Sequence, residues 1–197
     1  MANVFWSSAK PDPKRQYRFI VTIGDSQAAS ANPNRIPQFV AKTVTKPKVS
    51  VTTVPHMFLD HEFKYPGRVT WDPVTVTMVD PGGEDDMAAA LMNRLGISGY
   101  KYPDTDAQAL ISLSKEKASN ALGSVFISQL NAEGRTVEEW ALHNAFITSL
   151  DFGGLDYGSD DLSEISIELT YDWAVLNGSG GLGVADAAGG LIVPDQL

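Results

Sequence analysis

The feature that most constrains the fold is a strict two-residue alternation across residues 163–175. Two sets of side chains alternate there, one apolar and one polar: Ile165, Ile167, Leu169, Tyr171 and Trp173, against Ser166, Glu168, Thr170 and Asp172. Successive side chains of a β-strand point to opposite faces, so the pattern predicts a strand with one buried face and one polar, acidic face.

A long ribbon is predicted over residues 61–80, where the chain reads HEFKYPGRVTWDPVTVTMVD. Polar and apolar residues alternate on both sides of Tyr65-Pro66-Gly67-Arg68. Pro-Gly favours a turn, because proline fixes φ at the first turn position and glycine accepts a positive φ at the second. We therefore predict a hairpin with strands near 62–65 and 75–79 and a basic tip that carries Lys64 and Arg68.

Shorter patterns organise the rest of the chain. Extended runs are predicted at 17–23, 39–44, 49–54, 125–130, 136–142 and 145–152. A helix is predicted over 84–96, with Gly96 as its stop, and a second from 104 or 105 to 121 in a connecting segment at 97–122. The sequence predicts a mainly β (α+β) domain over 1–176 and a Gly-rich tail at 177–197.

The charge of the chain bears on its partners. The formal net charge is −9, which argues against non-specific nucleic-acid binding because phosphate contacts need clustered Lys and Arg. Residues 1–75 carry ten Lys and Arg and five Asp and Glu, whereas residues 76–197 carry five and nineteen. If these halves lie on different surfaces, copies could attract one another head to tail, and rising salt should weaken that attraction. Alternatively, both sets lie mixed on one surface and serve solubility.

Composition sets the expected compartment. No apolar run reaches the roughly 20 residues that a spanning helix needs, so we expect no membrane partner. The chain contains no cysteine, which favours synthesis in a reducing cytoplasm and rules out thiolate metal sites and a cysteine nucleophile.

Motifs that would carry chemistry are weak. His56 and His61 are five residues apart, which in an extended chain places them on opposite faces and disfavours a shared metal. Residues 178–183 match G-x-G-x-x-G, but too little chain follows to complete a dinucleotide fold. Carboxylates between 156 and 164 do not have the spacing of a calcium loop. We therefore expect no enzyme activity, no cofactor and no metal.

Four segments have to be considered together: YRFIVTI, FVAKTVTKPKVSV, KYPGRVTWDPVTVTMVD and HNAFITSLDFGGLDYGSDDLSEISIELTYDWAVL. In this order they resemble the T4-type tail tube proteins of contractile-tailed bacteriophages, over about 15–96 and 123–175. The last segment carries the most specific pattern: Asn144, Ala145, Phe146, Thr148, Asp156, Tyr157, Asp160, Glu164, Ile165, Tyr171, Asp172 and Trp173. Residues 97–121 and the Gly-rich tail depart from the family.

The resemblance implies a β-sandwich or barrel of the tail tube type, with a long hairpin and one or two flanking helices. It implies hexameric rings whose joined sheets line a channel, stacked into a tube inside a contractile sheath. The expected partners are further copies of the chain, the sheath protein, the baseplate and the tail terminator, in a virion assembled in the host cytoplasm. Phage DNA would pass through the lumen without specific binding.

The same resemblance suggests roles for individual residues. Glu168 and Asp172 become candidates for an acidic channel lining that repels phosphate. Contacts between subunits or rings are expected at Lys64, Tyr65, Pro66, Gly67 and Arg68.

Other assignments stay open at this point. The chain could be a tube initiator or terminator instead of the main tube subunit. It could also be the tube protein of a type VI secretion system or a tailocin, which work without packaged DNA. A soluble β-domain enzyme or binding module is the alternative of another class.

Overall fold

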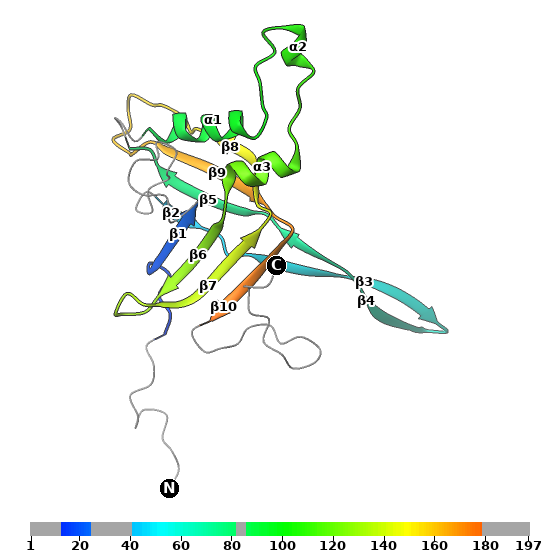
Figure 1. Cartoon of the computed structure of the whole chain (residues 1–197). Helices are drawn as coiled ribbons and strands as arrows, with labels where there is room; N and C mark the ends of the chain where they lie inside the picture. The colour runs from blue at the N-terminus through cyan, green and yellow to red at the C-terminus, as the bar shows by residue number, and fades with distance from the viewer. Residues whose placement is uncertain (1–12, 25–40, 82–85, 179–197) are drawn as a thin grey trace.

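Two four-stranded antiparallel sheets pack face to face, and a separate two-stranded ribbon extends away from them (Figure 1). This arrangement comes from a computed structural model that describes residues 13–24, 41–81 and 86–178. Strand content dominates, as the alternation in the sequence predicts.

The strand order of each sheet brings together segments from both halves of the chain. The first sheet has the order β1 (Phe19–Ile23), β6 (Val125–Leu130), β7 (Thr136–His143) and β10 (Trp173–Gly178). The second has the order β2 (Ala41–Val44), β5 (Val74–Val79), β9 (Glu164–Thr170) and β8 (Phe146–Asp151). Strands were predicted in all of these segments, although several predicted ends differ from the observed ones by one to three residues in either direction.

The core lies between the two sheets. The inward side chains of β5 and β9 are at most 1% exposed: Val74, Val76, Met78, Ile165, Ile167 and Leu169. They face apolar side chains of the first sheet, such as Val21, Ile127 and Leu142, and Met87 and Leu91 from a helix join the same cluster. The predicted burial of the odd-numbered positions of β9 is therefore confirmed.

The predicted long strand over 163–175 is in fact two strands in different sheets. β9 ends at Thr170, the chain turns at residues 171–172, and β10 begins at Trp173 in the other sheet. Tyr171 stays buried and donates its hydroxyl to the carbonyl of Asp72 at 2.9 Å. Trp173 is 46% exposed and stacks on His143, with ring centroids 5.0 Å apart. Inward and outward side chains alternate along one strand, but this alternation does not continue where the chain turns into another sheet. The prediction that Trp173 lies on the buried face is therefore wrong.

Three helices connect β5 to β6. α1 (Met87–Ile97) begins at Asp86, whose carboxylate accepts a hydrogen bond from the amide of Ala89. It continues through Gly96 and is followed by Gly99 at φ +112°, so the expected glycine stop lies three residues later than predicted.

The second predicted helix is divided. α2 (Asp106–Ala109) and α3 (Lys115–Leu122) each begin after their own cap, Thr105 and Ser114, which accept amide hydrogen bonds. Two strong cap residues within one predicted helix start two helices. α3 contacts both α1 and β8.

The predicted domain boundary needs one adjustment. β10 runs to Gly178, so the first two residues of the predicted tail pair with Glu139 and Glu138 of β7. Residues 179–197, with most of the G-x-G-x-x-G match, lie outside the described residues. The division into one domain and a tail stays a prediction.

Candidate assembly surfaces

The ribbon consists of β3 (Lys48–Phe58) and β4 (His61–Asp72), eleven and twelve residues long. The turn that joins them is Leu59-Asp60, because Phe58 pairs directly with His61. The predicted turn at Tyr65-Pro66-Gly67-Arg68 is therefore wrong, and all four residues lie within β4. Lys64 and Arg68 are therefore not at the tip. Two acidic residues, Asp60 in the turn and Glu62 close to it, lie there instead of a basic pair.

A β-bulge explains how Pro66-Gly67 fits inside a strand. The pairing shifts by one residue between Val51 and Thr53, so that Thr52 faces both Gly67 and Arg68. The Thr52 hydroxyl accepts from the Arg68 amide at 2.9 Å and donates to the Arg68 carbonyl at 3.2 Å. A Cβ on Gly67 would lie 2.5 Å from that hydroxyl oxygen. Proline, which has no amide hydrogen, is tolerated at such a bulge in an edge strand.

The cross-strand pairs give the outer part of the ribbon two different faces. We define its aromatic face as Val54, His56, Phe58, His61, Phe63 and Tyr65, which the pairing places on one side. His56 and Tyr65 are in edge contact, with ring centroids 6.4 Å apart. The prediction that His56 and His61 point to opposite faces is wrong, because the turn lies between them and reverses the chain.

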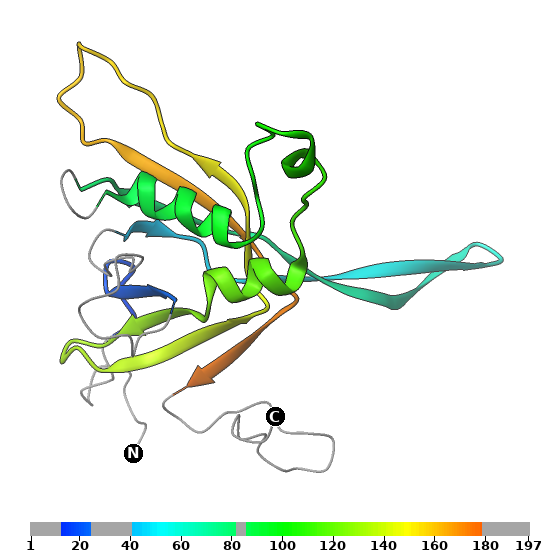
Figure 2. The same cartoon turned by 45° about the horizontal axis from the view of Figure 1, so that its top comes forward.

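The apolar side chains of the ribbon are open to solvent in the single chain. Those at least 49% exposed are Val49, Val51, Val54, Met57, Phe58, Leu59, Phe63, Tyr65 and Val69. Figure 2 shows the ribbon extending away from both sheets. An isolated two-stranded hairpin is at best marginally stable in water, and a large exposed apolar surface marks an interaction site.

The five predicted contact residues are divided among different parts of the ribbon. Tyr65 lies on the aromatic face and Lys64 and Pro66 on the opposite face, whereas Gly67 and Arg68 form the bulge. Their part in contacts between copies stays a prediction.

The outer face of the second sheet is rich in hydroxyl groups. The pairing places Thr77 beside Ser166 and Thr75 beside Glu168. The other polar side chains of this face are Thr43, Thr148, Ser149, Asp151 and Thr170. Lys42 is tied to Glu164 at one end of the sheet. Its charged side chains are three carboxylates, at Asp151, Glu164 and Glu168, and the ammonium of Lys42, so this face is weakly acidic.

Asp172 does not belong to that face. It lies in the turn between β9 and β10, where its carboxylate accepts from the Lys115 ammonium at 2.7 Å and from the Asn144 amide at 2.8 Å. The hydrogen bond from Lys115, followed by that from Asn144, lowers the pKa of Asp172. The reason for grouping Asp172 with Glu168, a shared strand face, is therefore wrong.

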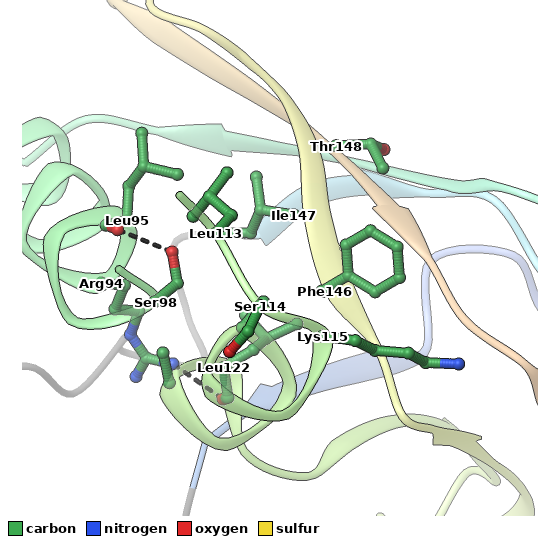
Figure 3. A pocket seen from close by; sticks show the side chains of 12 residues that line it. Arg94, Leu95, Ser98, Leu113, Ser114, Lys115, Leu122, Phe146, Ile147 and Thr148 are labelled. Atoms are coloured by element: carbon green, nitrogen blue, oxygen red, sulfur yellow. Dashed lines mark hydrogen bonds between the residues drawn. The ribbon is translucent and has the colours of Figure 1, made fainter. Parts of the chain in front are cut away.

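A groove of about 420 Å³ lies between α1, α3 and the edge strand β8 (Figure 3). Its walls are mainly apolar: Leu95, Leu113, Ala118, Ala121, Leu122, Phe146 and Ile147. In the close view, Leu95, Leu113 and Ile147 lie next to one another along the groove, and the Lys115 side chain extends past Phe146.

Ion pairs connect the basic half of the chain to the acidic half within one molecule. Lys14 and Lys46 both bind Glu138 on β7, and Lys42 binds Glu164 on β9. Part of the charge contrast seen in the sequence is therefore neutralised inside the subunit.

Side chains that could bind a metal do not cluster in the part of the chain that the structure describes. Within the ranges 13–24, 41–81 and 86–178, no group of three or more His, Asp or Glu side chains could hold a metal ion. No helix in those ranges is long and apolar enough to cross a membrane.

Comparisons with known proteins show which solved structures this architecture resembles. No protein-family model and no curated protein sequence matches the chain. It is similar to the tube terminating cap of the anti-feeding prophage, with a TM-score of 0.62 and 22% identity, over 91% of this chain and 100% of that one. The chain has the tail-tube fold. The sheath/tube terminator of an extracellular contractile injection system, PVC, gives 0.61 and 23%, over 86% and 100%.

The likeness extends to a sheath-tube complex. The extended PVC sheath-tube complex gives a TM-score of 0.58 and 23% identity, over 84% of this chain and 92% of that one. The tail-tube fold implied by the sequence resemblance is thus confirmed, although these structures do not single out the T4 type.

The ribbon tip and the groove were not predicted from the sequence. The ribbon tip could have been located from its mirrored pattern, since aromatic or His side chains flank Leu59-Asp60 symmetrically at positions 56, 58, 61 and 63. The groove had no sequence signal, because its walls come from α1, α3 and β8.

Proposed function

We propose that the chain is a structural, non-enzymatic subunit that assembles with its own copies into stacked rings of a contractile tail or injection apparatus. The observation that carries this proposal is the projecting ribbon, which leaves nine apolar side chains at least 49% exposed. The tail-tube fold supports it, because the similar structures come from a sheath-tube complex, a tube terminator and a tube cap.

The T4-type sequence pattern adds the finer parts of the proposal. The rings are hexameric, they lie inside a sheath between baseplate and terminator, and the tail belongs to a phage virion assembled in the host cytoplasm. DNA leaves through the lumen. Capsid and terminase genes beside the gene for this chain would support the phage assignment, and their absence would favour a secretion or injection system.

The outer face of the second sheet is our candidate for the channel wall. Its hydroxyl groups and the central carboxylate of Glu168 offer a phosphate backbone little to bind, because Lys42, at one end of the sheet, is already paired with Glu164. DNA would therefore pass without adhering. We expect Glu168→Lys to slow ejection while tubes still form, and a cryo-EM map with Glu168 outside the lumen would refute this assignment.

A tube terminator is the second candidate function. It is favoured by the complete coverage of the terminator and cap chains by this fold. A main tube subunit should polymerise alone into long tubes, whereas a terminator should stop at single rings.

The decisive experiment is negative-stain electron microscopy of the purified chain over a range of concentrations, with sedimentation velocity in parallel. We expect rings or tubes. A strict monomer at the highest concentration would contradict the assembly proposal and favour a soluble enzyme or binding module.

A further inference from the structure

The groove between α1, α3 and β8 is suited to an apolar occupant. Two hydroxyl groups that line it already have partners within the chain: Ser98 donates to the Leu95 carbonyl at 2.6 Å, and Thr148 donates to the Glu168 carbonyl at 3.1 Å. Arg94 donates to the Leu122 carbonyl at 2.9 Å (Figure 3). A polar ligand would therefore lose its water without gaining these groups as partners.

The ribbon tip has matching chemistry. Met57, Phe58 and Leu59 are 65%, 61% and 84% exposed and lie next to one another at the end of the ribbon. We call these three residues the apolar tip. The volume of the groove is within the range of sites that enclose small apolar groups.

The two surfaces of one chain cannot meet each other. Both views show the ribbon leaving the body away from α1 and α3 (Figures 1 and 2). A tip that enters such a groove must therefore belong to another copy.

The charges beside the two surfaces are complementary. Asp60 and Glu62 flank the apolar tip, and Lys115 on α3 lines the groove. Lys115 is bound to Asp172, but its side chain is still 58% exposed. Complementary charge fixes the orientation of a contact more than its strength.

From these observations we infer that the groove between α1, α3 and β8 receives the apolar tip of a second copy. This inference rests on the proposed self-assembly and names the two surfaces that meet. Each copy would contribute one tip and one groove, so the contact is heterologous and extends into rings or filaments.

Cysteine crosslinking tests the contact directly, because the chain contains no native cysteine. The variant Leu59→Cys with Ala118→Cys should give a ladder of covalent oligomers after mild oxidation. The matched control, Leu155→Cys with Ala118→Cys, uses a side chain that is 95% exposed on the β8–β9 loop and should stay largely uncrosslinked. Equal ladders from the two variants would refute the inference.

Two complementary variants separate assembly from folding. Leu59→Gly with Phe58→Ala removes the tip, and glycine suits the φ of +54° at position 59. Ala118→Phe fills the groove without removing an apolar side chain, and Asn120→Phe adds the same ring elsewhere on α3. The tip variant and the Ala118→Phe variant should each keep the thermal midpoint of the wild type. Each should associate at least about tenfold more weakly, as expected when an interface anchor is lost.

Mixing the two disabled variants gives the sharpest result. One keeps its groove and the other its tip, so together they should form a 1:1 heterodimer that cannot grow. Mixtures that remain monomeric would overturn the inference. If wild-type tubes form while the crosslink fails, the proposed function stands and this contact is refuted.

Discussion

Glu138 joins three separate parts of the chain through one carboxylate. It binds Lys14 before β1, Lys46 between β2 and β3, and the indole nitrogen of Trp140 at 2.7 Å. Burial acts to raise the pKa of Glu138, but the hydrogen bonds from Lys14, Lys46 and Trp140 outweigh it and hold the pKa at about 2.

This low pKa predicts a loss of stability in acid. A carboxyl group whose pKa is depressed on folding stabilises the protein above its ordinary pKa, near 4.5, and the effect disappears as pH falls toward 2. We expect the free energy of unfolding to decrease by ~1–3 kcal/mol across that window, discounted because both lysines are about half exposed. Urea unfolding at several pH values measures this change. In Glu138→Gln, the free energy of unfolding should lose the corresponding part of its slope against pH. An unchanged slope would count against the network.

Two glycines with positive φ provide a matched pair. Gly24 has φ +94°, and an added Cβ would lie 2.9 Å from the guanidinium of Arg94, which is only 6% exposed. Gly134 has φ +76° in the β6–β7 turn, with no atom within 4 Å of an added Cβ. We expect Gly134→Ala to cost ~1 kcal/mol of unfolding free energy and Gly24→Ala ~2–4 kcal/mol. Equal losses by chemical denaturation would show that Arg94 moves aside freely.

At the scale of elements, the bulge decides the shape of the ribbon. Thr52 forms both hydrogen bonds to Arg68, and the closeness of its hydroxyl leaves position 67 without room for a side chain. Sequence patterns assign Pro-Gly to a turn because local chemistry cannot show that a threonine fifteen residues earlier supports an extended path.

Gly67→Ala should therefore loosen the ribbon without unfolding the sandwich. We expect faster amide hydrogen exchange across β3 and β4, with exchange in β5 and β9 unchanged, since the ribbon forms its own two-stranded sheet. Gly154→Ala is the control, because no atom lies within 4 Å of its added Cβ. Protection of the ribbon as strong as in the wild type would contradict this role for the bulge.

At the scale of the whole molecule, charge and apolar surface are competing causes of assembly. The sequence alone suggests attraction between a basic and an acidic half. In the structure, Lys14, Lys42 and Lys46 of the basic half are already paired with Glu138 and Glu164. The exposed apolar ribbon has no comparable partner among the described residues.

We therefore expect assembly to survive high salt. Screening weakens exposed ion pairs, whereas apolar contacts do not depend on them. Sedimentation velocity in 0.1 and 1 M NaCl should show oligomers in both. Dissociation in 1 M NaCl would restore the charge-driven hypothesis.

The sequence by itself determined the local features of this protein. It predicted extended structure in the segments that form the two sheets, the buried parity of Ile165, Ile167 and Leu169, and the first helix. These features depend on side-chain periods and caps within a few residues, so a single stretch of chain contains all the information needed.

Only the tertiary structure decided where the chain turns and which surfaces form. The ribbon reverses at Leu59-Asp60, and Asp172 faces Lys115 instead of sharing a face with Glu168. The groove exists because α1 and α3 settle beside β8. Each of these depends on pairing register or on contacts between segments far apart in sequence, which no local pattern specifies.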